Sequence, residues 1–196
     1  MRKAQQERNT RETQIKCKMN IDGVGTSKIY LEIGFLKHML ETFSKHSLID
    51  LEITAKGDTF VDQHHLIEDL GLVLGKTLLL ALGDKKGIYR SGFMVYPMDE
   101  ALAVISIDIG GRAYLQYDLP LSRRFCGDFD TDLLADFFQA FTNELRANLV
   151  IRVPHGRSDH HKIEAVFKGI AKSLRFACAI DDRIRDFIPS TKGVIE

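Results

Sequence analysis

The chain has 196 residues, of which 44% are hydrophobic and 28% charged, so it is long enough to bury a substantial core. Lys+Arg and Asp+Glu both number 27, and this neutral balance gives no indication of the basic surface of a nucleic-acid-binding protein. The N-terminus is polar and has no apolar core, so we expect no signal peptide. The longest apolar run, 70–82, is short and interrupted by Lys76, so we expect no membrane span.

The first part of the chain predicts two strands, a helix, a third strand and a second helix. Apolar and polar residues alternate over 14–22, which is typical of a half-buried strand. A turn at 22–25 then predicts a returning strand that begins at Ile29. Apolar residues take helical spacing over 34–46, alternation resumes over 48–54, and a helix runs from Asp62 to about Leu82.

The same order recurs in the second part of the chain. Two strands over 101–109 and 113–117 precede a helix over 131–145, a strand over 149–153 and a helix from Ser158. We therefore expect an internal duplication, with units at 1–88 and 89–185 and a polar tail at 186–196 that is mobile unless a ligand orders it. The predicted fold class is α+β: two fused, pseudo-symmetric strand-strand-helix-strand-helix repeats, with the sheet packed on the helices.

The cysteines indicate a cellular compartment. Cys17, Cys126 and Cys178 are an odd number and form no close pair in the sequence. They favour free thiols in a reducing environment over disulfides or a zinc ribbon, so we expect a cytoplasmic protein.

A doubled motif is the strongest functional signal. Two adjacent histidines followed three residues later by a glutamate occur twice at a constant offset: His64, His65 and Glu68, then His160, His161 and Glu164. Imidazole and carboxylate groups clustered in this way are ligands for a first-row transition metal. Asp62 and Ser158 each suit the N-cap of the helix that follows, where the helix dipole keeps the imidazoles neutral and able to bind metal.

Other interpretations of the histidines fit less well. A single histidine at a helix start is usually a cap or a surface residue, but a repeat at constant offset is not expected by chance. His38 also fits a solvated helix face, His46 a helix end and His155 a loop. The HExxH spacing of zinc proteases is absent, and the predicted strands leave too little chain for a ferritin-like di-iron bundle.

These motifs and several further stretches give the chain a resemblance to the imidazoleglycerol-phosphate dehydratase family of histidine biosynthesis. The resemblance runs from about Arg11 to Gly193. The supporting stretches are Arg11-Glu12-Thr13, 34–40, 81–88, 97–101, 127–131 and 189–193.

The resemblance implies two fused α/β units per chain, a closed shell of 24 chains, and two Mn(II) ions per site at subunit interfaces. The implied metal ligands are His38, His64, His65, Glu68, His160, His161 and Glu164. The implied substrate contacts are Glu12, His46, Arg90, Asp99, Arg112, Lys168, Ser190 and Lys192, of which the basic residues and Ser190 would hold a phosphate. The partner would be a small-molecule phosphate, with no nucleic acid and no membrane.

The reaction that the resemblance implies is loss of water from imidazoleglycerol phosphate to give imidazoleacetol phosphate. A metal-bound imidazolate would expel the C3 hydroxyl of the substrate. Glu164 would remove the C2 proton, while Glu12 and Asp99 would position hydroxyls or relay protons.

Five positions depart from the usual family pattern: Lys37 for aspartate, Thr42 for glutamine, Gln63 for aspartate, Asp136 for histidine and Ser158 for asparagine. Asp136 can still be a metal ligand, because carboxylates bind manganese well. An ammonium at Lys37 opposes metal binding unless it points away or pairs with a carboxylate. The sequence therefore leaves two hypotheses: an active manganese dehydratase, or a divergent homologue with impaired catalysis or altered metal or substrate that acts as a binding protein or structural shell.

Overall fold

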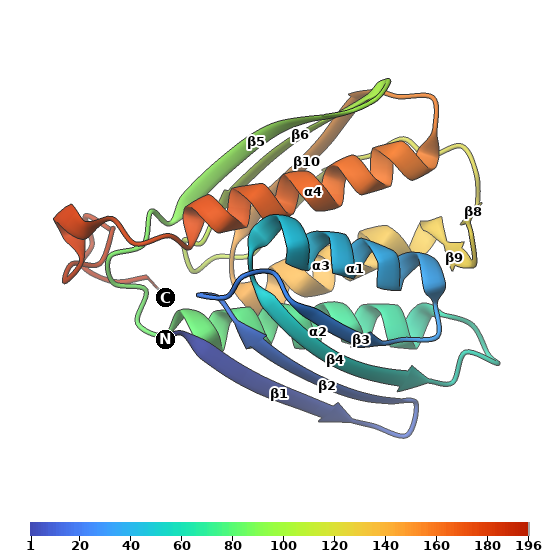
Figure 1. The fold of residues 1–196 in the computed structure, drawn as a ribbon, viewed down its shortest axis with the longest axis horizontal. Coiled ribbons are helices and arrows are strands. Elements are labelled where there is room, and N and C mark those ends of the chain that lie inside the picture. Colours follow the sequence, from blue (N-terminus) through green and yellow to red (C-terminus); the bar gives the residue numbers. More distant parts are fainter. Residues whose placement is uncertain (196) are drawn as a thin grey trace.

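Four helices lie between two four-stranded sheets in the computed structural model, which describes residues 1–195 (Figure 1). The first half contains β1 (Lys3–Asn9), β2 (Thr13–Asn20), β3 (Ser27–Tyr30), α1 (Gly34–Ser47), β4 (Asp50–Gly57) and α2 (His64–Leu82). The second half begins with β5 (Ser91–Met98), β6 (Ala101–Asp108) and β7 (Tyr114–Asp118), followed by a short hairpin of β8 (Phe125–Cys126) and β9 (Phe129–Asp130). It continues with the 3-10 turn η1 (Thr131–Leu133), α3 (Leu134–Leu145), β10 (Asn148–His155), α4 (Asp159–Ala177) and a second 3-10 turn, η2 (Asp182–Ile184). The expected α+β class with two similar halves is confirmed.

Each four-stranded sheet has one more strand than the sequence predicted, and the short strands β8 and β9 were not predicted either. The additional strands are β1 and β5, which form the outer strand of each sheet next to β2 and β6. The segment of β1, Lys-Ala-Gln-Gln-Glu-Arg-Asn, has almost no apolar residues to alternate. In β5, Phe93 and Val95 on the exposed face are as apolar as Met94 and Tyr96 on the other. Neither segment therefore shows the alternation by which a half-buried strand is recognised.

The predicted hairpin between the strands before the first helix is wrong. β3 pairs with β4 in parallel, with Ile29 opposite Ile53, and β4 separates it from β2. The second half repeats this arrangement, with Leu115 of β7 opposite Leu149 of β10. Because a helix follows β3 and β7, the chain returns in a parallel crossover and not in a tight turn.

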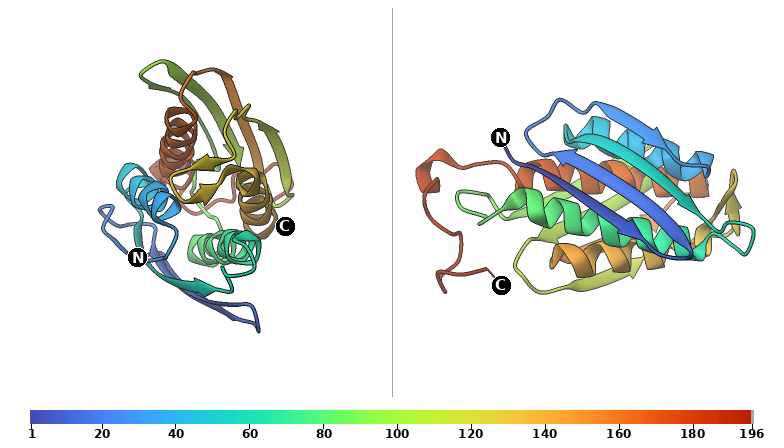
Figure 2. Two further views of the ribbon diagram at one scale, coloured as in Figure 1. Left: turned by 90° about the vertical axis from the view of Figure 1, so that its right-hand side faces the viewer. Right: turned by 90° about the horizontal axis from the view of Figure 1, so that it is seen from below.

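All four helices begin at the same end of the molecule (Figures 1 and 2). α1 packs on α4 and α2 packs on α3, so each contact joins the two halves. The contact between α2 and α3 is close, because a Cβ atom added at Gly71 or Gly75 would lie 2.4 or 2.3 Å from a backbone oxygen of α3. The positive ends of four helix dipoles therefore point to one end of the molecule.

Two further expectations concern membranes and thiols. Within residues 1–195, no helix is both long and apolar enough to cross a membrane. Cys17, Cys126 and Cys178 are buried free thiols, as the sequence predicted. Burial raises the pKa of Cys17 and that of Cys178 to about 12, which leaves both thiols protonated and unreactive.

Candidate active site

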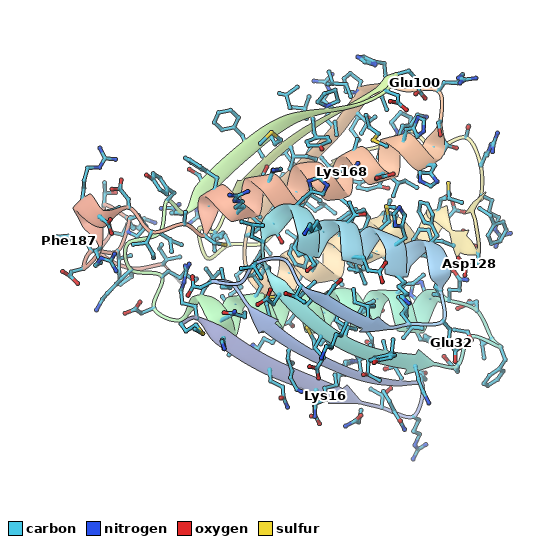
Figure 3. All side chains as sticks on the ribbon, in the orientation of Figure 1. Lys16, Glu32, Glu100, Asp128, Lys168 and Phe187 are labelled. Carbon is cyan, nitrogen blue, oxygen red and sulfur yellow. The ribbon has the colours of Figure 1, made fainter. Side chains whose placement is uncertain are left out.

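The end at which the helices begin is held together around the β8–β9 hairpin. Asp128 accepts hydrogen bonds from the backbone N–H groups of Gly34 (2.6 Å) and Phe35 (2.9 Å) and so caps α1. Gln63 donates to the Asp128 carbonyl (2.6 Å) and accepts from the Asp130 N–H (3.1 Å), which fixes the start of α2. Asp128 and Glu100 lie toward this end and Phe187 lies at the opposite one (Figure 3).

The motif helices begin close to where the sequence placed them. Ser158 caps α4 as predicted, because its side chain accepts from the His161 N–H. In α2 the N-cap position is Gln63, one residue later than predicted, although the Asp62 carboxylate still accepts from the His64 N–H (2.8 Å). Both histidine pairs therefore occupy the first helical turn.

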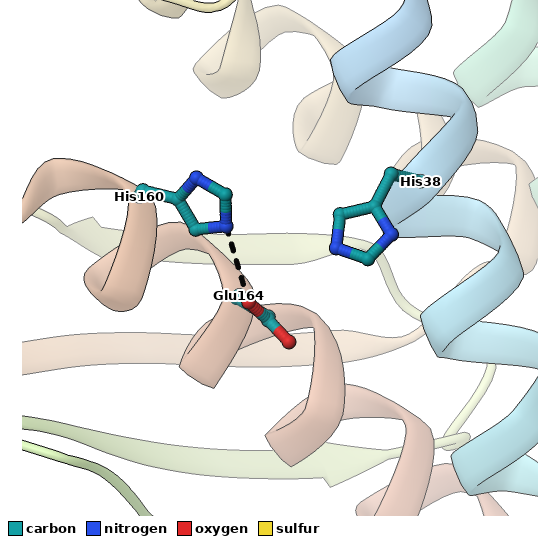
Figure 4. A group of neighbouring side chains, drawn as sticks. All are labelled: His38, His160 and Glu164. Carbon is teal, nitrogen blue, oxygen red and sulfur yellow. Dashed lines mark ion pairs between the residues drawn. The ribbon is translucent and has the colours of Figure 1, made fainter.

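A first cluster, which we call the α1–α4 cluster, consists of His38, His160 and Glu164. Each offers one ligand atom, and these atoms lie within 4.8 Å of one another. His160 Nε2 is 3.3 Å from Glu164 Oε2, and the ring of His38 on α1 faces them from the neighbouring helix (Figure 4). Imidazoles and a carboxylate from two packed helices are a donor set that could hold a metal ion.

The α2–α3 cluster is its counterpart in the duplicated fold and consists of His64, Glu68 and Asp136. His64 Nε2 is 3.8 Å from Glu68 Oε2, and His64 Nδ1 is 3.6 Å from Asp136 Oδ2. Again a motif helix of one half meets the other helix of the opposite half. Asp136 on α3 lies beside His64 as His38 on α1 lies beside His160, but Asp136 and Glu68 face different nitrogens of the His64 ring.

The second histidine of each pair points elsewhere, between two carboxylates. His65 Nδ1 lies 3.1 Å from both carboxylate oxygens of Asp58, and His65 Nε2 lies 4.0 Å from Glu12. The hydrogen bond with Asp58 raises the pKa of His65, which opposes the effect expected from the helix dipole at this position. We call His65 and His161 the outer histidines.

His161 has the same surroundings in the second half. Its Nδ1 atom lies 2.8 Å from Glu100 Oε2, and its Nε2 atom lies 3.8 Å from Asp99 Oδ2. Hydrogen bonds from His161 and from the Ser158 N–H lower the pKa of Glu100 to about 2, so this carboxylate is ionised at neutral pH.

Two of the predicted substrate contacts adjoin the α1–α4 cluster. Lys168 Nζ is 2.8 Å from Glu164 Oε1 and 5.9 Å from the centre of the Tyr96 ring, and the His46 ring packs edge-on against Tyr96. Burial favours the neutral form of Glu164, but the hydrogen bond and positive charge of Lys168 outweigh it and lower the pKa of this carboxyl. Burial and the charges of Lys168 and Lys172 lower the pKa of His46, which favours a neutral imidazole.

The model of the imidazoleglycerol-phosphate dehydratase family matches residues 32–174. Imidazoleglycerol-phosphate dehydratase of Koribacter versatilis is 48% identical over 195 residues, covering 100% of both chains, and that of Pseudomonas putida is 47% identical over 194 residues, covering 99% of this chain and 98% of the relative. The chain belongs to the imidazoleglycerol-phosphate dehydratase family. The family's members are hydro-lyases of histidine biosynthesis, and the family and enzyme class expected from the motifs are confirmed.

Solved structures of family members have the same fold. The enzyme of Staphylococcus aureus superposes with a TM-score of 0.83 at 38% identity, covering 91% of this chain and 99% of the other. That of Pyrococcus furiosus gives a TM-score of 0.82 at 33% identity, covering 96% and 99%.

The remaining predicted substrate contacts of the family lie far from the histidines in this chain. Arg90 donates two hydrogen bonds to Asp108 (2.7 and 2.9 Å) and one to the Pro189 carbonyl (3.0 Å), and its N–H bonds the carbonyl of Ala177 at the C-terminal end of α4. Ser190 and Lys192 follow Pro189 in the tail, and the Arg112 carbonyl accepts from Asn148 at the start of β10. A helix of 19 residues is about 28 Å long, so these residues lie near the opposite end of α4 from His160.

The departures from the family pattern do not block the clusters. Lys37 lies 3.9 Å from Glu41 on its own helix while Asp136 lies against His64, so in the described part of the chain the two do not pair. Gln63 and Ser158 both fix helix starts. Nothing in the structure explains the threonine at position 42.

Sequence reasoning missed Asp58 and Glu100. Asp58 follows Gly57 at the end of β4, and Glu100 lies in the turn between β5 and β6. Acidic residues are common in turns, so nothing in the single sequence separated these two from others. Their contacts to His65 and His161 come from tertiary structure alone.

Proposed function

We propose that this protein catalyses the manganese-dependent dehydration of imidazoleglycerol phosphate to imidazoleacetol phosphate. One observation carries the proposal: both motif helices meet a helix of the opposite half, so the duplicated fold presents two clusters of imidazole and carboxylate donors at one end of the molecule. Bound there, two Mn(II) ions would supply the positive charge that stabilises the imidazolate form of the substrate, whose electrons expel the C3 hydroxyl.

The residues present fit divalent ions. The side chains that would hold them are His38, His160 and Glu164, then His64, Glu68 and Asp136, with the outer histidines His65 and His161. Donor pairs within these groups are separated by 3.3 to 3.8 Å. Two ligand atoms that share an ion at about 2.1 Å are separated by up to about 4 Å, so His160 and Glu164 need only a small movement. His64 faces Glu68 with Nε2 and Asp136 with Nδ1, so its ring would have to turn for all three side chains to bind one ion.

Three carboxylates would serve the substrate itself. Glu164 is the base that removes the C2 proton, because it is 8% exposed and Lys168 keeps it ionised. Glu12 and Asp99 occupy equivalent turns before β2 and β6 and lie beside the outer histidines. We assign to them the positioning of substrate hydroxyls and the relay of protons.

The phosphate would be held by residues of a different chain. Arg90, Arg112, Ser190 and Lys192 lie near the opposite end of α4 from His160, and the substrate, with bonds of about 1.5 Å, is on the order of 10 Å long. One chain cannot present both groups to one substrate. We therefore propose a homo-oligomer with each site at a subunit interface, and 24 chains by resemblance to the family.

Two departures from the family pattern bear on the alternative of an impaired homologue. Asp136 keeps a ligand within reach of His64, and Lys37 reaches Glu41 on its own helix. Neither observation favours loss of activity.

The experiment is turnover of imidazoleglycerol phosphate by purified protein reconstituted with manganese, together with metal analysis. We expect product formation with wild-type protein, loss of turnover in His160→Ala, and little change in Glu52→Gln, a surface carboxylate that pairs with Lys18 and lies outside both clusters. Substoichiometric metal and no turnover in the reconstituted wild type would contradict the proposal.

A further inference from the structure

We propose that Asp58 and Glu100 are positioning residues, which hold the outer histidines with Nδ1 protonated and Nε2 free to bind a metal ion. The inference rests on the proposed function in one respect, namely that His65 and His161 bind metal. It adds two carboxylates that neither the motifs nor the family resemblance assigns a role.

The first half gives the geometry for His65. Both Asp58 oxygens lie 3.1 Å from His65 Nδ1, so the N–H at this atom donates to the carboxylate as a whole. The Asp58 backbone N–H donates to the Glu12 carbonyl (3.0 Å), and the Glu12 carboxylate lies 4.0 Å from Nε2 on the other side of the ring. Asp58 therefore connects the imidazole to the turn that carries a predicted catalytic carboxylate.

The second half gives the same geometry for His161 with a different carboxylate. Glu100 Oε2 accepts from His161 Nδ1 at 2.8 Å, and Glu100 Oε1 accepts from the N–H groups of Ser158 (2.7 Å) and Arg157 (3.2 Å). Both oxygens thus already have protein donors. Although Glu100 lies close enough to Asp99 and His161 to join a metal site, its hydrogen bonds favour a supporting role.

The same arrangement of carboxylates surrounds both outer histidines, which argues against a chance contact in each half. Asp58 comes from the segment between β4 and α2, whereas Glu100 comes from the turn between β5 and β6, so they do not occupy equivalent positions of the repeat. Nevertheless each outer histidine has a carboxylate at Nδ1 and another one 3.8 to 4.0 Å from Nε2. The arrangement around the ring is common to the two halves, although the residue that supplies the Nδ1 partner is not.

The chemistry of metal-binding imidazole explains what these two carboxylates would do. A carboxylate that accepts from one ring nitrogen fixes the tautomer, orients the ring and makes the other nitrogen a stronger donor. The first histidines of the motifs differ, since His160 Nε2 itself faces Glu164. Orientation by Asp58 and Glu100 therefore concerns the outer histidines alone.

The test compares Asp58→Asn and Glu100→Gln with Glu52→Gln, which alters a surface carboxylate that pairs with Lys18 (2.6 Å). Each variant is prepared as the full chain in its native assembly. In the metal-free protein, nitrogen-15 spectra of labelled histidine, recorded by solid-state NMR, report the tautomer of each ring. Electron paramagnetic resonance of free Mn(II) then gives the affinity during titration with manganese.

We expect Asp58→Asn to change the tautomer population of His65 and Glu100→Gln that of His161. Each should weaken manganese binding by about 10- to 100-fold, with Glu52→Gln unchanged. An unchanged tautomer in both variants overturns the inference, and so does a lower melting temperature with no change in tautomer or affinity, which marks a structural role. If the wild type takes up no manganese, the proposed function fails, and the spectra of the metal-free protein still decide whether these carboxylates position the rings.

Discussion

Asp136 Oδ2 lies 3.6 Å from His64 Nδ1, across the contact between α3 and α2. The equivalent contact between α1 and α4 brings His38 to His160 and Glu164. A carboxylate in one cluster and an imidazole in the other therefore occupy corresponding places. The two proposed metal sites would differ in charge by one unit at this ligand, because aspartate is ionised where histidine is neutral.

Asp136→Ala should remove a ligand from the α2–α3 cluster only. We expect manganese content to fall by about half and turnover to be lost, because the α1–α4 cluster keeps all its donors and both ions are needed. Elemental analysis of reconstituted protein measures the content. The control is Asp132→Ala, an acidic residue one turn earlier, which should keep full occupancy; loss of both ions, or of neither, would be inconsistent with two separate clusters.

Gly71→Ala and Gly75→Ala should destabilise the protein by forcing α2 and α3 apart. The added methyl would lie 2.4 Å from the Phe137 carbonyl oxygen or 2.3 Å from that of Phe141, so backbone has to move. We expect a loss of about 1–3 kcal/mol each, measured by thermal unfolding. Lys76→Ala is the comparison: this half-exposed residue of α2 pairs with Glu144 of α3 (3.7 Å), and its loss should change stability by less than about 1 kcal/mol.

Asp50 should contribute to stability at neutral pH and lose its contribution in acid. Burial disfavours its ionised form, but hydrogen bonds from the Thr26 and Val24 N–H groups outweigh burial and lower its pKa to about 2. Since the folded pKa lies below the unfolded value, the stabilisation is complete above about pH 4 and disappears as pH falls toward 2.

Asp50→Asn is the corresponding variant. We expect it to be about 1–2 kcal/mol less stable than wild type at pH 7, with a difference that shrinks toward pH 2.5, as followed by denaturant unfolding at each pH. A difference that stays constant with pH would show that packing, and not the charge, is what the substitution removes.

The elements that sequence reasoning found are those with clear periodicity, such as α4 and β6. It missed β1 and β5 because one has too few apolar residues and the other has them on both faces. The histidines of the motifs were recognisable because they repeat, whereas Asp58 and Glu100 were not, because their partners are fixed only by tertiary packing. The separation of Arg90 from His160 was also inaccessible, since only a tertiary contact, the hydrogen bond from the Arg90 N–H to the Ala177 carbonyl, places Arg90 at the C-terminal end of α4.

The separation of Arg90 from His160 within one chain predicts complementation between two inactive variants. Each variant should be inactive alone, because Arg90→Ala lacks a phosphate contact and His160→Ala lacks a metal ligand. Mixed by co-expression, the two variants should regain turnover, because a site that takes Arg90 from one chain and His160 from another can have both intact. His160→Ala mixed with Glu164→Gln is the matched control and should stay inactive, since these side chains lie 3.3 Å apart in one chain and belong to the same cluster. Turnover no higher in the first mixture than in this control would mean that each chain builds its site alone, and the proposed subunit interface would have to be abandoned.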